Sequence, residues 1–337
     1  MRRHLLPFSA ALFLVCAAAL ALPGAAQARQ GHHKLHKKGT KPPPGGQPPH
    51  LTYYGGPVIP NVKVVAVFWG DKVDAATKKD IPTFYGDVVQ SSLFDWLSEY
   101  STPTQKIGRG SFVSAVTIHP GPKLLSGTIT DAQIQAELSS QLSKKALTDS
   151  DQADTIFMIH FPPKLVIKSG AGTSCVQFCA YHGNIKGKSI YYGVMPDQGA
   201  GSGCEHSCGQ GSTSFDNLTS TATHELVEAV TDARVGDVGN KLSAPLAWYD
   251  PSKDAHGGEY AEIGDICGAY DGALKGAHRS WNVQTEWSNK KGGCIVDGAS
   301  TPIAIAGSKP GGTGGAAAHG SAAGSKAGKA VAKKKGR

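Results

Sequence analysis

The sequence predicts an α/β (α+β) domain in which helices pack on a mixed β-sheet and disulfides add stability. Three observations support this fold class. Short runs rich in β-branched residues alternate with longer segments of helical periodicity along residues 51–299. Six of the seven cysteines fall within the same stretch. One helical segment, residues 214–232, also gathers acidic side chains on a single face.

Three elements are expected in the first half of the domain. Residues 62–69 (VKVVAVFW) are apolar and β-branched, which is typical of a strand. Residues 75–99 show helical spacing of apolar residues, with Pro82 near the expected start. Residues 112–118 (FVSAVTI) alternate in character, so a second strand is expected there.

The alternation of strands and helices continues in the second half. Residues 130–147 have apolar residues at helical spacing, and Thr130 or Asp131 is suited to cap the N-terminus. Residues 155–161 and 189–195 are predicted strands, separated by a glycine- and cysteine-rich loop. A strand–helix order of this kind predicts a mixed sheet with helices packed on it.

One domain is expected over residues 51–299, with a different kind of segment on either side. Residues 1–28 have a basic start, an apolar run and a small-x-small site, which predicts a secretory signal peptide and a secreted protein. The alternative is a membrane anchor, but the run is short for a span and no second apolar stretch follows. Residues 29–50 are predicted to be a disordered basic linker rich in proline and histidine. Residues 300–337 are predicted to be a disordered tail rich in Gly, Ala and Lys.

The net charge of +8 belongs to the two ends. Residues 1–50 and 300–337 hold 14 Lys and Arg residues and no Asp or Glu, which leaves 20 basic and 26 acidic side chains in residues 51–299. An acidic folded part argues against nucleic-acid binding. The basic ends predict contact with anionic cell walls or envelopes.

The six cysteines of the exported chain predict disulfides, because thiols oxidise outside the cytoplasm. Six cysteines allow 15 pairings, and spacing alone selects none of them. We expect Cys267 to pair with Cys294, and the other four to form bridges among themselves: Cys175, Cys179, Cys204 and Cys208. The alternative is a zinc knot made from the two C-x3-C units.

Residues 214–232 (SFDNLTSTATHELVEAVTD) carry the most chemical information. Ser214 or Asp216 is expected to cap this helix. On a helical wheel, one imidazole and three carboxylates share about a quarter of the circumference, with apolar residues on the far side: His224, Glu225, Glu228 and Asp232. Like charges on one helical face repel, so this pattern is easier to understand with a cation among them.

The H-E-L-V-E pattern in this segment predicts a zincin-like active-site helix. His224 and Glu228 stand at i and i+4, the spacing at which a helix presents two ligands to one metal. Glu225 stands where H-E-x-x-H zinc hydrolases keep their general base. Glu228 replaces the second histidine, and a carboxylate also binds Zn²⁺. The alternative is a solvent-exposed acidic face with no metal.

A zinc hydrolase needs a third protein ligand and an open position for water. We expect Glu262 to be that ligand, because E-I-G-D resembles the glutamate-zincin pattern, in which a ligand Glu is followed three residues later by a supporting Asp. The resemblance implies that Asp265 orients His224. Asp232 is expected to support the site in the same way. Tyr249 is expected to stabilise an oxyanion, with a core position as the alternative. Other candidates for the third ligand are His182, Asp250 and His256.

Several short motifs along residues 54–294 resemble those of a known protein family. They are Y-G-G-P-V at 54–58, C-x-x-x-C-x-x-H-G at 175–183, the helix end at 228–232 and the cysteine loop 267–294. Together they resemble the EXORDIUM / phosphate-induced protein 1 family over nearly all of residues 51–297. The resemblance implies a secreted protein, which in plants is associated with cell-wall growth responses. Plant members lack the His-Glu pair, and sequences that keep H-E-x-x-E look like a bacterial branch with metallopeptidase-like features. The resemblance therefore implies that the fold need not be catalytic.

Three functions are consistent with these features. The first is a secreted zinc metallopeptidase-like hydrolase that acts on peptides or proteins. The second is a non-catalytic extracellular or wall-associated protein whose acidic site is structural and binds Ca²⁺ through oxygen ligands. The third is a carbohydrate-binding module that uses exposed aromatic residues: Trp248, Trp281 and Trp287. We expect the first function, with Zn²⁺ as the metal.

Overall fold

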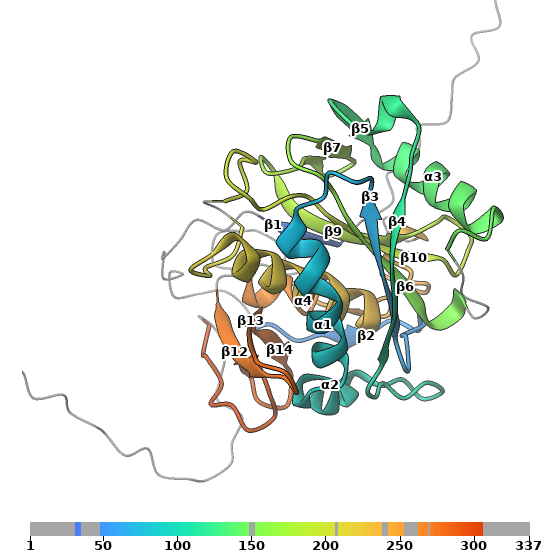
Figure 1. Cartoon of the computed structure of the whole chain (residues 1–337). Coiled ribbons are helices and arrows are strands. Elements are labelled where there is room, and N and C mark those ends of the chain that lie inside the picture. Colours follow the sequence, from blue (N-terminus) through green and yellow to red (C-terminus); the bar gives the residue numbers. More distant parts are fainter. Residues whose placement is uncertain are drawn as a thin grey trace, which may run out of the picture.

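Four adjacent parallel strands form most of the main β-sheet (Figure 1). They coincide with the four apolar runs that the sequence predicts as strands, and their order across the sheet is β10, β6, β3 and β4. β3, β6 and β10 are buried along nearly their whole length, which suits β-branched side chains on a sheet that is covered on both faces. The four strands are β3 (Lys63–Trp69), β4 (Ser111–Ile118), β6 (Thr155–His160) and β10 (Tyr191–Met195).

A computed structural model describes the chain over seven ranges: 31–34, 48–147, 152–205, 208–237, 242–252, 262–268 and 270–305. The expected signal peptide and most of the expected tail lie outside these ranges, as does His256. Within them, no helix has the length and apolar character that crossing a bilayer requires.

Two antiparallel strands complete the sheet at one edge. β9 (Phe178–Asn184) pairs with β10, and β1 (Gly31–Lys34) pairs with β9. The sequence predicts a loop where β9 stands, because the region between residues 161 and 189 is rich in glycine and cysteine. β1 takes four residues of the predicted linker, residues 29–50, into the sheet.

The helices lie where the sequence predicts them, but their first and last residues differ from the prediction. The single helix predicted over residues 75–99 is two helices, because Ser91 stands between them and caps the second. Pro82 lies inside the first helix and not near its start. The predicted cap Thr130 is confirmed at the start of the third. The helices are α1 (Ala75–Val89), α2 (Ser92–Leu97), α3 (Asp131–Ser143) and α4 (Ser214–Thr231).

Helices cover both faces of the sheet, so the core has two apolar layers (Figure 1). Successive side chains of a strand point to opposite faces. Val64 and Phe68 of β3 therefore pack in the layer beneath α1 and α4, whereas Val65 and Trp69 pack in the layer beneath α3. This alternation accounts for the mixed α/β architecture that the sequence predicts.

Short strands form four smaller sheets around this core. In one of these sheets, strand β13 packs on the side of α4 that faces away from β9 and β10. α4 is therefore enclosed between the main sheet and the C-terminal strands. The remaining strands are β2 (Thr52–Tyr53), β5 (Thr128–Thr130), β7 (Val166–Ser169), β8 (Gly172–Thr173), β11 (Trp248–Tyr249), β12 (Asp271–Lys275), β13 (Ser280–Gln284), β14 (Glu286–Ser288) and β15 (Gly293–Ile295).

Three disulfides join the six cysteines. The predicted Cys267–Cys294 bond is confirmed. The other four cysteines pair across the two C-x3-C units, as Cys175–Cys204 and Cys179–Cys208. The zinc knot is therefore wrong, because its thiolates are all consumed by disulfides. Three disulfides fit an extracellular protein.

The tryptophans considered as a sugar-binding surface contribute to packing instead. Trp281 and Trp287 are buried in the main core. Trp248 is half-buried and lies edge-on to Tyr100, with ring centroids 5.3 Å apart. These residues do not offer the exposed aromatic platform that a carbohydrate-binding module would need.

Candidate metal centre

α4 carries the H-E-x-x-E residues and begins with a capping box. The Thr213 hydroxyl accepts a hydrogen bond from the Asp216 amide at 3.0 Å, and the Asp216 carboxylate accepts one from the Thr213 amide at 3.1 Å. The cap is therefore Thr213 and not Ser214. Asp216 serves as the partner of the cap.

The acidic side of α4 is buried. His224, Glu225 and Glu228 are each 0 % exposed, and so is Asp232 at the helix end. The alternative of a solvent-exposed acidic face is therefore wrong. Burial of several carboxylates without compensation is costly, so this region requires bound cations or retained protons.

His224 and Glu228 meet as their spacing predicts. Nε2 of His224 lies 3.1 Å from Oε1 of Glu228. The same Glu228 oxygen accepts the amide of Asp265 at 3.0 Å, and the Asp265 carboxylate lies 4.0 Å from Nε2 of His224. Asp265 belongs to η5 (Asp265–Cys267), a short 3₁₀ helix, so a loop distant in sequence closes over this part of α4.

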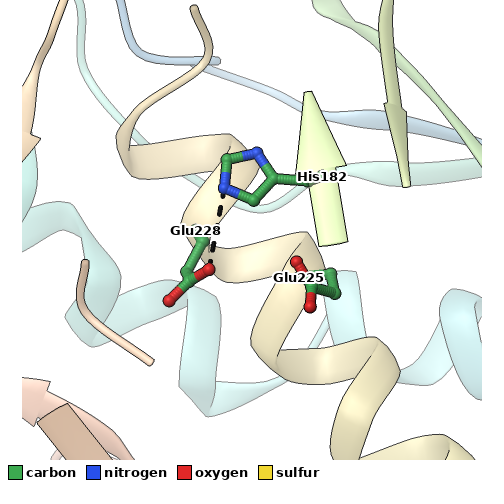
Figure 2. Close-up of side chains that lie close together, drawn as sticks. All are labelled: His182, Glu225 and Glu228. Carbon is green, nitrogen blue, oxygen red and sulfur yellow. Dashed lines mark ion pairs between the residues drawn. The ribbon is translucent and has the colours of Figure 1, made fainter. Parts of the chain in front are cut away.

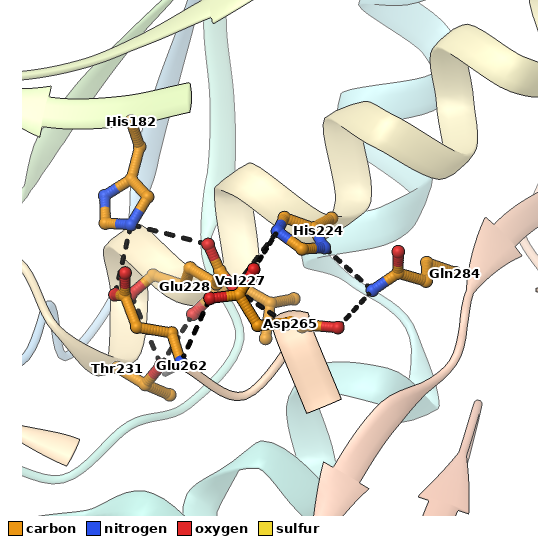
Figure 3. A network of polar contacts seen from close by, with 9 residues as sticks. His182, His224, Val227, Glu228, Thr231, Glu262, Asp265 and Gln284 are labelled. Atoms are coloured by element: carbon orange, nitrogen blue, oxygen red, sulfur yellow. Dashed lines mark hydrogen bonds and ion pairs between the residues drawn. The ribbon is translucent and has the colours of Figure 1, made fainter. Parts of the chain in front are cut away.

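A second histidine approaches the other side of Glu228 (Figures 2 and 3). His182 projects from β9, and its Nε2 lies 3.6 Å from Oε2 of Glu228 and 3.1 Å from Oε1 of Glu262. Each oxygen of Glu228 thus faces a different imidazole. Figure 3 shows the resulting chain of contacts from His182 through Glu228 to His224.

Two groups of potential ligand atoms result, and Glu228 belongs to both. One group is His224, Glu228 and Asp265. The other is His182, Glu225 and Glu228. Within each group the atoms lie within 4.8 Å of one another. Because each group combines one imidazole with carboxylates, its donors suit Zn²⁺ and other first-row divalent metals better than Ca²⁺, which prefers oxygen alone.

Gln284 and Gly264 fix the orientation of the His224 ring. Nε2 of Gln284 lies 2.8 Å from Nδ1 of His224 and donates a hydrogen bond to the Gly264 carbonyl at 2.9 Å. A Cβ atom at Gly264 would lie 2.6 Å from Nδ1, so the ring occupies space that only glycine leaves open. These contacts direct Nε2 of His224 toward Glu228.

Burial governs the pKa values in this region. It raises the pKa of Glu262 and of Asp232 well above the usual range, and the Glu228 charge adds to both shifts. Burial lowers the pKa of His182 to about 4, in spite of the opposing effect of Glu228. Burial is the largest single effect on His224 and lowers its pKa, but the nearby carboxylates of Glu228, Glu225 and Asp265 together raise that pKa well above the usual value. At neutral pH the His182 ring is therefore neutral and keeps a lone pair for a metal.

The structure places some predicted site residues beside a different histidine from the one that the sequence predicts. Glu262, expected to join His224 as the third ligand, instead contacts His182. Asp265, expected as a supporting residue, lies in the ligand group of His224. Asp232 ends α4 and accepts the Ala247 amide at 3.0 Å.

The other candidates lie in different surroundings. Tyr249 is 6 % exposed and packs with Leu246 and Tyr54, which matches the core position considered as its alternative. Asp250 accepts hydrogen bonds from the amides of His50 and Ser252. Asp250 therefore orders the turn toward Ser252 and connects it to the N-terminal segment at His50.

Two residues of the centre escape sequence reasoning. Gln284 lies at the end of β13, and no local pattern in the sequence marks it as a site residue, although it falls within the cysteine loop 267–294 that resembles the family. Glu286, on β14, is 0 % exposed, and burial raises its pKa well above the usual range, with the charges of His224 and Glu228 also acting on it. A buried acid beside a tryptophan gives no periodic pattern, so only the folded chain brings it to the site.

No family model, curated protein or solved structure matches the chain. The resemblance to the EXORDIUM / phosphate-induced protein 1 family therefore stays a prediction from short motifs, and functional inference depends on the site.

Proposed function

We propose that the protein is a secreted, zinc-dependent, metallopeptidase-like hydrolase. The observation that carries the proposal is the position of Glu228, a fully buried carboxylate placed between two imidazoles with Glu225 one turn away on the same helix. Purely structural ion pairs rarely gather so many acids in one interior, because desolvation costs exceed the Coulombic gain. A metal-binding role explains why the chain retains them.

The residues suit hydrolysis of a peptide bond. A bound divalent ion would lower the pKa of a water molecule and polarise the substrate carbonyl. His224, Glu228 and Asp265 would hold that ion, and Gln284 would keep the His224 ring in place. Glu225 follows the first ligand directly and would accept the proton of the attacking water.

Metal analysis combined with one substitution tests this function. Purified full-length protein is dialysed, its zinc content is measured, and hydrolysis of a fluorogenic peptide library is followed. We expect bound zinc and zinc-dependent cleavage. Glu225→Gln should reduce cleavage by about 10²–10⁴-fold, the range for loss of a general base. Glu137→Gln on α3, outside the centre, is the matched control. Full activity in Glu225→Gln would remove the assigned role.

A second function has one observation in its favour. The ligand residues are completely buried, with 0 % exposure at His182, His224 and Glu228, which is typical of a metal that stabilises a fold. A non-catalytic extracellular protein with such a structural metal would show a metal-dependent rise in melting temperature without cleavage of any library peptide. A response to Ca²⁺ but not to Zn²⁺ would favour the oxygen-ligand version of this function.

A further inference from the structure

The buried centre has two halves related through one carboxylate. Oε1 of Glu228 faces His224 at 3.1 Å, and Oε2 faces His182 at 3.6 Å. We propose that this centre binds two divalent transition-metal ions, with Glu228 bridging them. The inference deepens the proposed function, because it shares its premise that α4 binds metal.

The ligand groups divide the histidines between two positions. The first position is bounded by His224, Asp265 and Glu228, and His224 faces Oε1 of Glu228. The second is bounded by His182, Glu225 and Glu228, and His182 faces Oε2. Each group is compact, and Glu228 is the member that the two share. Because a zinc–nitrogen bond is about 2.0–2.1 Å long, one ion could hold both imidazoles only if their nitrogens lay within about 4 Å of each other. The grouping instead gives each histidine its own set of carboxylates.

Glu228 has the environment of a bridging ligand. It is 0 % exposed, and Oε1 already accepts the Asp265 amide. Within the described parts of the chain, Oε2 has no hydrogen-bond donor. A buried carboxylate oxygen without a donor is costly, and coordination of a second ion would compensate for it. Two-metal hydrolytic sites hold their ions about 3.5–4 Å apart, a separation that one carboxylate spans with its two oxygens.

The local charge also favours two ions. Six buried carboxylates interact in this region: Glu225, Glu228, Asp232, Glu262, Asp265 and Glu286. Ligating imidazoles are neutral, so one divalent ion offsets two of the six possible negative charges and a second ion offsets two more.

The second position changes what two residues do. Glu225 would bind the second ion and would not serve as a free base. Glu262, which lies 3.1 Å from Nε2 of His182, would be a positioning residue that sets the angle of this ring. Two-metal hydrolases hold an attacking water and a substrate oxygen between their ions, so the reaction class remains hydrolysis.

Metal counting on the full chain tests the proposal. Metal-free protein is titrated with Zn²⁺ by calorimetry, and bound metal is measured after gel filtration. We expect about two equivalents for the wild type and about one each for His182→Gln and His224→Gln, because each removes one imidazole. Glu228→Ala should lose both high-affinity sites. His119→Ala, an exposed histidine far from α4 in the sequence, is the matched control and should keep both.

Electron paramagnetic resonance of the Mn²⁺-loaded wild type adds a readout that needs no variant. Two ions bridged by one carboxylate should give an exchange-coupled spectrum, whereas a single ion gives an isolated six-line signal. One equivalent of metal with an isolated signal would overturn the bridged pair and leave the single-metal hydrolase standing. No bound metal at all would overturn both. Glu225→Gln also separates them: loss of one equivalent supports the bridged pair, and unchanged stoichiometry with lost cleavage contradicts it.

Discussion

Replacement of Gly264 by alanine tests the packing that positions His224. Gly264 has φ −79° and ψ −39°, a conformation that alanine adopts without strain, so only space is at issue. The new Cβ would lie 2.6 Å from Nδ1 of His224, and ordinary contact begins at 3.4 Å, so the ring must move by about 0.8 Å. That movement breaks the 2.8 Å contact with Gln284 and displaces Nε2 from Glu228. Overpacking of this kind costs about 1–3 kcal/mol, and disturbing a ligand's support weakens metal binding by about 10–100-fold.

Two measurements on Gly264→Ala check these values. Urea unfolding of the metal-free protein gives the loss of stability, and competition with a chromophoric chelator gives the zinc affinity. Gly121→Ala is the matched control, because Gly121 also has a negative φ of −57° and its added Cβ would meet nothing within 4 Å. If Gly264→Ala unfolds and binds zinc like Gly121→Ala, the ring does not need this space and the packing argument fails.

Three further predictions concern residues around the core. Gln284→Ala should lower zinc affinity by about 10–100-fold with normal secondary structure in circular dichroism, because the His224 ring loses its anchor. Asp87→Ala should cost about 1–3 kcal/mol in urea unfolding, because Trp281 Nε1–H and the His278 amide lose their buried acceptor. Burial lowers the pKa of His160 to about 3, so the unfolded chain binds the extra proton first and stability falls as pH drops from 6.5 toward 3. The difference in free energy of unfolding between wild type and His160→Gln should fall by about 2–3 kcal/mol between pH 7 and pH 4.5. A difference that stays constant with pH would contradict the assignment.

Local patterns were sufficient to predict much of the fold. Three of the parallel strands are continuous apolar runs, β4 alternates in character, and α3 and α4 have clear helical periodicity, so each gives a signal in a short window. β9 was missed because its sequence, FCAYHGN, is buried on both faces yet includes His182 and Asn184. Those polar residues are buried for a long-range reason, since His182 meets Glu228 and Glu262, and no local pattern can reveal it.

In the candidate site, too, local contacts can be predicted from the sequence and long-range contacts cannot. His224 and Glu228 were predictable because one helical turn brings them together. The roles assigned to Glu262 and Asp265 depend on how a loop closes over α4, and three residues of spacing could not decide which carboxylate reaches which histidine. Glu286 joins from a strand of only three residues, so its burial follows from the packing of the C-terminal strands.

The Cys267–Cys294 bond has a consequence for the order in which the protein matures. It fastens the short 3₁₀ helix that begins at Asp265 to β15, the last strand in the described part of the chain, so the cross-link helps to hold Asp265, one of the three members of its ligand group, over α4. A reducing cytoplasm would leave Asp265 without this cross-link until the chain meets an oxidising environment. Closure of this disulfide would in this way link oxidation of the chain to the position of Asp265 beside His224.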